Sequence, residues 1–425
     1  MNNTLRPVAV VGGMRIPFCR SNSAYSDLSN QDMLVTALNG LVEKYSLENQ
    51  LIDEVMAGAV ICHTRDWNFA RECVLSTKLS PLTQGITLQQ ACGTSLQAAL
   101  ISSAKIATGQ IDSAIAAGAD TVSDVPIVFG NKFSRRLVSL GRARSVMDKI
   151  KMFKGFGPGE LKPIPPSVNE PRTLLSMGQH CELMAKQWNI TREAQDELAY
   201  QSHTKAAAAY NEGFFDDLIT PCSKVVRDNN MRPDTTIEAL SGLRHAYDKS
   251  EAGTLTAGNS TPLTDGASSV LLASEEWAKD HGLPVLAYLT HGQTSAVDFV
   301  EGEGLLMAPA VAVSQMIDRA GITLQDFDFY EIHEAFAAQV LSTLAAWESE
   351  DYCVNRLGRK SAMGSIDRAK LNLKGSSLAV GHPFAATGAR IVGTLAKIID
   401  EHSGGRGLIS VCTAGGMGVT AIMER

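Results

Sequence analysis

Two cysteines and two histidines, far apart in the chain, have types and local contexts that suit carbonyl chemistry. They are Cys92 in QQACGTS, His333 in EIHEAFAAQ, His382 in AVGHPFAATGAR and Cys412 in SVCTAGGMGV. An imidazole makes a thiol into the thiolate that attacks a carbonyl carbon, so one such pair indicates an acyl-enzyme reaction. A second cysteine adds a step, because a thiol could add or remove a proton at the carbon next to a thioester carbonyl. Together the four residues indicate making or breaking of a carbon–carbon bond.

Each cysteine also has an ordinary structural interpretation, because a free cysteine is often a small buried hydrophobic residue. Cys92 has small neighbours and opens a helix whose N–H groups are expected to lower the thiol pKa. Cys412 precedes TAGGMG, whose glycines let backbone amides approach a ligand. The cysteines without such surroundings are interpreted as structural: Cys19, Cys62, Cys73, Cys181, Cys222 and Cys353.

The two histidines differ in how strongly their contexts indicate function. His382 lies between Gly381 and Pro383 at the start of a helix, which is an unusual place for a packed histidine. A neutral imidazole there could act as a base. His333 follows the apolar and acidic run DFDFYEI and precedes a helix. By itself it fits a hydrogen-bonded histidine at a strand end as well as it fits a catalytic residue.

The elements around these residues alternate between strand and helix, as in layered α/β folds. In one segment a strand leads into Cys92, and a helix over about residues 95–107 and a buried strand follow. In another, a strand precedes His382, a helix runs through Ile398 and a strand ends at Cys412. The shared order predicts two similar halves, with a reactive residue at each strand-to-helix junction, where helix dipoles favour a thiolate or oxyanion.

The length of 425 residues exceeds what one hydrophobic core usually serves, which agrees with two halves. Residues 1–120 and 251–283 are predicted to form the first half. Residues 121–250, rich in helix-forming residues, are predicted to be a mostly helical insertion. The second half is predicted to cover residues 284–425, beginning near Pro284 in LPVLAYLTHG.

One part of the insertion, residues 132–154, is strongly basic. It has the single acid Asp148 against eight basic residues: Lys132, Arg135, Arg136, Arg142, Arg144, Lys149, Lys151 and Lys154. A solvated helical face is the ordinary interpretation. The functional alternatives are attraction of the phosphates of a nucleotide-bearing substrate, docking of an acidic partner, and contact with an anionic membrane surface. The sequence leaves these alternatives open.

Composition and motifs argue against several classes of function. A net charge of -7 and a pI of about 5.8 do not suit a protein whose main partner is nucleic acid. TAGGMG lacks the Lys-Ser/Thr of a phosphate-binding P-loop, and no G-x-G-x-x-G opens a helix after the first strand. Nucleoside triphosphate hydrolysis and hydride transfer from a nicotinamide cofactor are therefore disfavoured.

Cysteine spacing and the N-terminus indicate the cellular compartment. The cysteines form no C-x-x-C pair and no regular spacing, which favours reduced thiols over a disulfide framework or a zinc site. The start, MNNTLRPVAVVGG, lacks the features of a signal peptide, and no run of 18 uncharged apolar residues occurs. We therefore expect a cytoplasmic protein.

Along nearly its full length the sequence resembles the thiolases. It is most similar to the 3-ketoacyl-CoA thiolases of the fatty-acid oxidation multienzyme type. The resemblance is carried by HEAFAAQ with His333, GHPFAATG with His382, NSTPLTDGA from Asn259 and CTAGGMG with Cys412. QQACGTS is a looser match, because relatives often carry Arg or Asn before Ala-Cys. Many thiolases have Asn where this chain has His333, and the histidine is typical of the oxidation-complex branch.

The resemblance implies an acetyl-CoA C-acyltransferase of fatty acid β-oxidation with a ping-pong mechanism. His382 takes the proton of Cys92, whose thiolate attacks the 3-keto carbon of a 3-oxoacyl-CoA. Cys412 protonates the departing enolate to give acetyl-CoA, and coenzyme A then releases the shortened acyl chain from Cys92. The alternative is an acetyl-CoA C-acetyltransferase, or acetoacetyl-CoA thiolase, that works in the condensing direction.

The resemblance also implies how charge is stabilised. Backbone N–H groups of Cys92 and Ala414 surround one oxyanion, and His382 and His333, through water, surround the other. Relatives usually have Gly where this chain has Ala414. Two further residues align with positions that line the channel for the acyl chain and coenzyme A: Met177 and Thr261.

At the level of the whole protein, the resemblance implies duplicated halves in a five-layered αβαβα arrangement. It implies no metal and no cofactor other than coenzyme A as co-substrate. Family members are homodimers or homotetramers, and some join a hydratase-dehydrogenase subunit, for which the basic segment is a candidate surface. Contact of the protein with a membrane surface is a further alternative that the resemblance does not exclude.

Two rival hypotheses compete with a thiolase. One is a decarboxylating condensing enzyme that uses an acyl carrier protein, but such relatives have histidine or asparagine where this chain has Cys412. The other is a catalytically silent lipid-binding or scaffold relative. Silent relatives tend to lose a reactive residue, whereas this chain keeps all four.

Overall fold

The two halves of the chain pair their strands in the same order. The computed structural model describes residues 5–425, and its main strands are β1 (Val8–Arg15), β3 (Glu54–Gly58), β4 (Gln84–Thr87), β5 (Ser113–Asp120), β8 (Thr264–Ser274), β9 (Ala287–Ala296), β10 (Phe329–Ile332), β11 (Arg406–Thr413) and β12 (Met417–Glu424). In the first half, β3 pairs in parallel with β5, β5 pairs antiparallel with β8, and β8 pairs antiparallel with β1. In the second half, β10 pairs in parallel with β11, β11 pairs antiparallel with β12, and β12 pairs antiparallel with β9.

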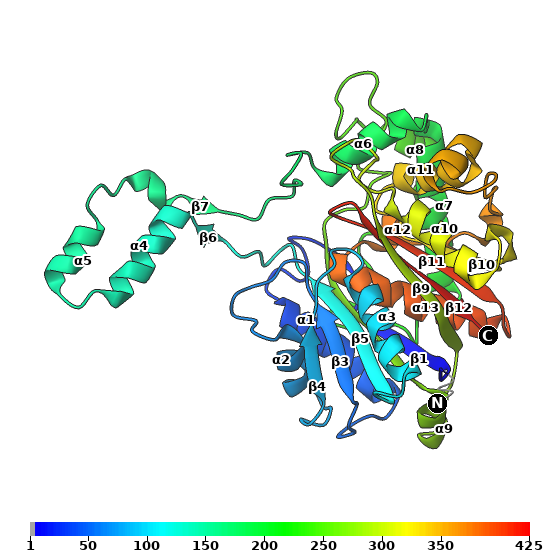
Figure 1. Cartoon of the computed structure of the whole chain (residues 1–425), viewed down its shortest axis with the longest axis horizontal. Helices are drawn as coiled ribbons and strands as arrows, with labels where there is room; N and C mark the ends of the chain where they lie inside the picture. The colour runs from blue at the N-terminus through cyan, green and yellow to red at the C-terminus, as the bar shows by residue number, and fades with distance from the viewer. Residues whose placement is uncertain (1–4) are drawn as a thin grey trace.

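Helices cover both sets of strands on both faces, and three core clusters show the layers (Figure 1). Helices α3 (Thr94–Ala107) and α13 (Thr387–Glu401) pack between the two sets and share one cluster with both. Helices α1 (Asn30–Lys44) and α2 (Phe69–Leu75) cover the outer face of the first set. Helices α10 (Ala308–Ala320) and α11 (Ala337–Glu348) cover the outer face of the second. The expectation of a five-layered αβαβα fold is confirmed.

The two central helices meet at a glycine. A Cβ placed on Gly388 would lie 2.3 Å from the backbone nitrogen of Leu96, so no larger residue fits without a shift. Next to this contact, the backbone N–H of Ala389 donates to the Ser95 hydroxyl at 2.8 Å. The N-terminal ends of α3 and α13, which follow Cys92 and His382, are therefore held against each other.

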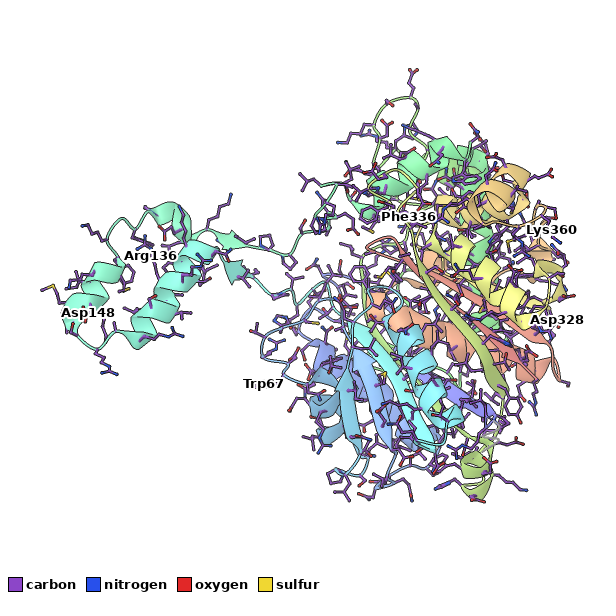
Figure 2. The ribbon with its side chains drawn as sticks, viewed as in Figure 1. Trp67, Arg136, Asp148, Asp328, Phe336 and Lys360 are labelled. Carbon is purple, nitrogen blue, oxygen red and sulfur yellow. The ribbon has the colours of Figure 1, made fainter. Side chains whose placement is uncertain are left out.

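Between β5 and β8 the chain forms helices of two kinds. Helices α6 (Met177–Gln187), α7 (Arg192–Asn211) and α8 (Ile237–Ser241) belong to the body. Residues 127–165, here called the arm, extend away from the body (Figures 1 and 2). The arm contains β6 (Val128–Phe129), α4 (Asn131–Arg142), α5 (Val146–Met152), the 3-10 turn η1 (Pro158–Leu161) and β7 (Pro163–Ile164).

Short elements complete the fold. They are β2 (Cys19–Arg20), α9 (Glu275–Asp280), η2 (Leu324–Asp326), η3 (Tyr352–Arg356), η4 (Arg368–Lys370), α12 (Ser377–Val380) and η5 (Phe384–Ala386). No helix in the described part of the chain, residues 5–425, has both the length and the apolar character needed to cross a membrane. The expectation that the chain begins without a signal peptide rests in part on residues 1–4, which lie outside the described residues.

Two local predictions were wrong. The strand expected to lead into Cys92 ends at Thr87, and a turn carries the chain to α3. The strand expected before His382 is the single helical turn α12. A short apolar run such as SSLAV does not distinguish a strand from a buried helical turn. Here the Glu334 carboxylate accepts the backbone N–H of Leu378 at 3.2 Å, which stabilises the start of the turn.

Candidate active site

Each of the four reactive residues lies at or near the end of a core element. Cys92 precedes α3, His333 follows β10, His382 follows α12, and Cys412 is the second-last residue of β11. The rings of His333 and His382 lie side by side, with centroids 4.1 Å apart. Gly93, next to Cys92, packs against Thr413, next to Cys412, since a Cβ on Gly93 would lie 2.9 Å from Thr413 Cγ2. Residues far apart in sequence therefore meet at the junction of the two halves.

The turn that presents Cys92 depends on small residues. Ala91 has a φ of 45°, in the left-handed region that residues with a side chain rarely adopt. Gly93 packs closely against the second half, since a Cβ there would lie 2.6 Å from Val419 Cγ2 and 2.9 Å from Thr413 Cγ2. A larger residue at position 93 would push Cys92 away from the end of β11.

The Cys92 thiol is protonated in the resting site. Burial raises its pKa to about 12, although hydrogen bonds from the backbone N–H groups of Ala414 and of Cys92 itself act in the opposite direction. The backbone donors do lower this pKa, as expected, but desolvation outweighs them. The two N–H groups are those that the resemblance assigns to an oxyanion.

His382 is held on one side and free on the other. Its backbone N–H donates to the Thr264 hydroxyl at 3.1 Å, and its Nδ1 lies 2.5 Å from Thr387 Oγ1. Within residues 5–425, its buried Nε2 has no hydrogen-bond partner. Burial lowers the pKa of His382 to about 3, so the imidazole is neutral. A neutral ring with a free nitrogen has the form that a general base requires.

His333 is fully buried and is held in a similar way. Its backbone N–H donates to the Ser410 carbonyl at 2.8 Å, and its Nδ1 lies 2.9 Å from Ser377 Oγ. Its Nε2 is the second buried imidazole nitrogen that no group in the described chain satisfies. Burial, followed by the charges of His382 and Arg390, lowers the pKa of His333 well below its ordinary value. A buried polar atom without a partner is costly, which suits an atom that meets a substrate.

Cys412 lies deeper than Cys92. Only 1% of its surface is exposed, and burial raises the pKa of its thiol well above the ordinary value. Gly415 and Gly416 follow it with φ of 77° and 71°, so the chain turns tightly beside the thiol. Cys412 is therefore a neutral thiol with a proton to give, next to a backbone that a ligand can approach.

The segment NSTPLTDGA links the two histidine loops. The Asn259 carbonyl accepts the backbone N–H of Ala337, and the backbone N–H of Thr261 donates to the Ala335 carbonyl, just after His333. The Thr261 hydroxyl donates to the carbonyl of Ser377 at 2.9 Å. Thr261 therefore lies between the two histidine loops. Met177 begins α6 and packs against the core cluster that includes Cys412.

Asp120 is a buried group that the sequence analysis did not identify. Its carboxylate accepts backbone N–H groups of Val60, Ile61 and Ala385 at 2.7 to 3.1 Å, and burial raises its pKa to about 7. It thus fixes the chain just after His382. The sequence could have indicated this residue, because Asp120 is an acidic residue at the end of the apolar run that ends in AAGAD.

Three other contributors were also missed: Ser377, Thr387 and Arg390. All lie within 8 residues of His382 in the sequence, but their types alone do not distinguish them from other polar residues.

The assembled groups can carry out both acyl transfer and proton transfer at carbon. Backbone donors surround one thiol, a second thiol lies nearby, and two neutral imidazoles present free Nε2 atoms. The first thiol can form an acyl intermediate, and the second can exchange a proton with an adjacent carbon.

Family models match both halves of the chain. A model described as the N-terminal domain of thiolase matches residues 8–276, and one described as the C-terminal domain of thiolase matches residues 283–425. The chain is 40% identical over 423 residues to the 3-ketoacyl-CoA thiolases of Shewanella baltica strain OS185 and Yersinia pestis strain Pestoides F. Each alignment covers 98% of this chain and 96% of the relative.

Solved structures show the same likeness. The acetyl-CoA acetyltransferase of Bacillus anthracis superposes with a TM-score of 0.82 at 29% identity, over 100% of both chains. The human mitochondrial 3-ketoacyl-CoA thiolase in complex with CoA superposes with a TM-score of 0.81 at 26% identity, over 99% of this chain and 98% of that one.

Proposed function

Because the chain belongs to the thiolase family, we propose that Cys92, His382, Cys412 and His333 form its catalytic site. The activity is that of a 3-ketoacyl-CoA thiolase, an acyltransferase that cleaves 3-oxoacyl-CoA with coenzyme A in fatty acid β-oxidation. The observation that carries the site assignment is a set of contacts at the end of β11. Gly93 packs against Thr413, the backbone N–H of His333 donates to the Ser410 carbonyl, and the rings of His333 and His382 lie 4.1 Å apart.

The first half of the reaction breaks the carbon–carbon bond. The Cys92 proton passes to Nε2 of His382 as the sulfur attacks the 3-keto carbon, and the N–H groups of Cys92 and Ala414 stabilise the resulting oxyanion. The bond between C2 and C3 then breaks, and its electron pair forms the enolate of acetyl-CoA. Cys412 gives its proton to C2, acetyl-CoA leaves, and the acyl chain stays on Cys92. The proton on His382 restores the Cys412 thiol.

The second half transfers the acyl group. The thiol of coenzyme A gives its proton to His382, and its sulfur attacks the acyl carbonyl on Cys92. The same two backbone N–H groups stabilise this second oxyanion. The shortened acyl-CoA leaves with the new carbon–sulfur bond, and Cys92 regains a proton from His382. Condensation is this sequence in reverse.

The two histidines have different tasks in this scheme. His382 exchanges a proton with sulfur in both halves. His333 does not exchange one, and its Nε2 stabilises the enolate oxygen together with His382, through water. Thiols, imidazoles and amides supply all of these steps, so we propose coenzyme A as co-substrate, with no metal and no resident cofactor.

A second candidate activity is that of an acetyl-CoA C-acetyltransferase working in the condensing direction. The observation in its favour is the likeness to the Bacillus anthracis acetyl-CoA acetyltransferase. The two activities share all bond changes and differ in the length of the acyl chain.

The deciding experiment is thiolysis of 3-oxoacyl-CoA substrates of increasing length. A 3-ketoacyl-CoA thiolase cleaves the long substrates, whereas an acetoacetyl enzyme cleaves only the four-carbon one. In parallel, brief incubation with acetyl-CoA followed by mass spectrometry should place an acetyl group on Cys92. Acetylation at another cysteine, with Cys92 unmodified, would contradict the assignment of the nucleophile.

Location and partners are also proposals. A reactive site built on two thiols requires a reducing compartment, which supports a cytoplasmic location. We propose a homodimer or homotetramer, and a hydratase-dehydrogenase subunit as a further partner. The substrates are acyl-CoA and coenzyme A, in agreement with the coenzyme A complex of the human relative.

A further inference from the structure

One buried contact of the site has no role in the reaction as described: the contact between Arg390 and Ser377. Nη2 of Arg390 donates to Ser377 Oγ at 2.9 Å and to Ser376 Oγ at 3.2 Å. Ser377 Oγ in turn lies 2.9 Å from Nδ1 of His333. All of these side chains are buried, and Arg390 is only 5% exposed.

We infer that Arg390 is a positioning residue which, through Ser377, keeps the proton of His333 on Nε2. This inference rests on the proposed thiolase function, in which Nε2 of His333 donates to the water that stabilises the enolate oxygen. The proton position decides whether that nitrogen can donate at all, because a neutral imidazole has one donor nitrogen and one acceptor nitrogen.

The direction of the hydrogen bonds follows from the chemistry of the two partners of Ser377. A guanidinium has only donors, so its N–H occupies a lone pair of the serine oxygen. The serine O–H must then donate elsewhere, and within residues 5–425 the remaining hydrogen-bond partner of Ser377 Oγ is Nδ1 of His333. If Nδ1 accepts that proton, the ring proton of neutral His333 is on Nε2.

The alternative arrangement places two donors on one hydroxyl. With the proton of His333 on Nδ1, Ser377 Oγ would accept from the ring and from Arg390 together, and its own O–H would lack a buried acceptor. A buried donor without a partner is costly. The positive charge behind the hydroxyl adds to this preference, because it repels a second donor hydrogen.

The second histidine provides a contrast within the same site. Nδ1 of His382 also meets a hydroxyl, that of Thr387, at 2.5 Å. No cation donates to Thr387 Oγ1 in the described part of the chain. That hydroxyl can therefore donate or accept, and His382 can carry its proton on either nitrogen. The two histidines thus differ: the ring proton of His333 is fixed on Nε2, whereas His382 can exchange its proton.

Two buried acidic residues, Glu331 and Glu334, lie near Arg390, and burial raises the pKa of Glu331 to about 8. Nη1 of Arg390 lies 3.9 Å from Oε2 of the buried Glu331. Glu334, next to His333, accepts from the Ser202 hydroxyl and from Nδ2 of Asn372, both at 2.7 Å. Burial lowers the pKa of Arg390 to about 10, with Glu331 and Glu334 acting against the shift, so the guanidinium stays protonated at neutral pH.

The direct test measures the proton position by NMR on the full-length enzyme labelled with ¹⁵N in histidine. A long-range ¹H–¹⁵N spectrum distinguishes protonated from unprotonated ring nitrogens, and the His333→Asn variant identifies the His333 signals. We expect neutral His333 with its proton on Nε2, and loss of this single form in Ser377→Ala. A proton on Nδ1 in the wild-type enzyme would overturn the inference, whether or not the thiolase assignment holds.

Kinetics test the consequence. Ser377→Ala should lower kcat for cleavage at least roughly 100-fold, as loss of an oxyanion donor does, with little change in KM. Transfer of an acetyl group from Cys92 to coenzyme A should stay near the wild-type rate, because that step uses the donors of Cys92 and Ala414. Ser376→Ala is the matched control, since its hydroxyl meets Arg390 but no histidine; we expect near-wild-type kcat.

A double-mutant cycle separates this role from simple structural support. Asparagine at position 333 offers an amide donor whose hydrogens do not depend on Ser377. In the His333→Asn background, Ser377→Ala should therefore lower kcat far less than it does in the wild-type enzyme. Equal losses in both backgrounds would overturn the inference. If Ser377→Ala does not fold, the NMR measurement on the wild-type enzyme still decides it.

Discussion

At the level of single residues, the reactive groups are neutral before substrate binds. Burial raises the pKa of Cys92 to about 12 and lowers that of His382 to about 3. A thiolate–imidazolium pair of Cys92 and His382 is therefore disfavoured. The proton leaves Cys92 as the sulfur attacks, when the backbone N–H groups gain an oxyanion to stabilise. This differs from thiol enzymes in which a histidine holds a preformed thiolate.

These pKa shifts predict how Cys92 reacts with iodoacetamide. A thiol pKa above the ordinary value means that the thiolate fraction is small at pH 7 and increases by roughly tenfold per pH unit below that pKa. The alkylation rate of Cys92, followed by mass spectrometry, should therefore rise steadily from pH 6 to pH 9. His382 has a lowered pKa and stays a neutral base over this range. A plateau between pH 6 and pH 8 would indicate a preformed thiolate and would contradict this account.

Cys412→Ala should separate the two halves of the reaction. Without the second thiol, the enolate has no proton donor, and cleavage of acetoacetyl-CoA should fall by about 100-fold to 10,000-fold. Acetylation of Cys92 by acetyl-CoA should continue, because it needs no proton at carbon. Spectrophotometric thiolysis and mass spectrometry measure the two steps. Cys62→Ala, which removes an exposed thiol, is the control with unchanged rates. Full cleavage activity in Cys412→Ala would refute the role of that thiol.

At the level of secondary structure, the contact between α3 and α13 positions the site. Cys92 lies just before one helix and Thr387, the hydroxyl partner of His382, begins the other. Because Gly388 leaves no room for a Cβ, the distance between these helix ends depends on one residue.

Gly388→Ala should therefore change both stability and activity. The added Cβ would lie 2.3 Å from the backbone nitrogen of Leu96, and such overpacking costs roughly 1–3 kcal/mol. Urea denaturation should show this loss, and kcat should fall because the start of α13 shifts. The control is Gly141→Ala in α4, where a Cβ meets no atom within 4 Å. That variant should be stabilised by about 0.5–1 kcal/mol or unchanged. Wild-type stability and kcat in Gly388→Ala would show that the helices adjust freely.

At the level of the whole molecule, the arm is separate from the catalytic body. Figure 2 shows Arg136 and Asp148 on the arm and Phe336, three residues after His333, in the body. The arm has its own contacts, such as the ion pair of Arg136 with Glu160 at 2.8 Å. Besides its basic residues, the arm has many exposed apolar side chains. They are Ile127, Val128, Phe129, Leu137, Val138, Val146, Met147, Ile150, Phe153, Leu161 and Ile164. An exposed apolar and basic surface favours contact with another molecule.

Deleting most of the arm should leave catalysis intact. Val128 pairs with Ile164, so the two ends of the arm are adjacent and a short Gly-Ser linker can replace residues 129–163. We expect unchanged kcat and KM in thiolysis, because no proposed catalytic residue lies on the arm. A folded variant with a raised KM for coenzyme A would instead assign the basic residues to attraction of the substrate phosphates. Loss of kcat would contradict the separation of arm and body.

Much of this protein could be read from its residues alone. The four reactive residues, the alternation of strand and helix, and the likeness of the two halves depend on local patterns, such as small residues around a cysteine or periodic apolar side chains. The alternation of strand and helix predicted only a layered α/β fold, whereas the family and the five layers followed from the resemblance of the motifs to the thiolases. The two local errors occurred where short segments precede Cys92 and His382. There, contacts with distant residues such as Glu334 decide the conformation.

Only the tertiary structure decided the electrostatic state of the site. Whether a thiol is a thiolate depends on how much water packing removes and on which backbone N–H groups face it, and both come from distant parts of the chain. The same holds for the bonds that join Arg390, Ser377 and His333, and for the arm that stands apart from the body. The sequence determines which side chains are available for the site, because it fixes the type of each residue and the order of residues along the chain. Folding determines their proton positions and pKa values, because desolvation and hydrogen bonding act between residues that only the fold brings together.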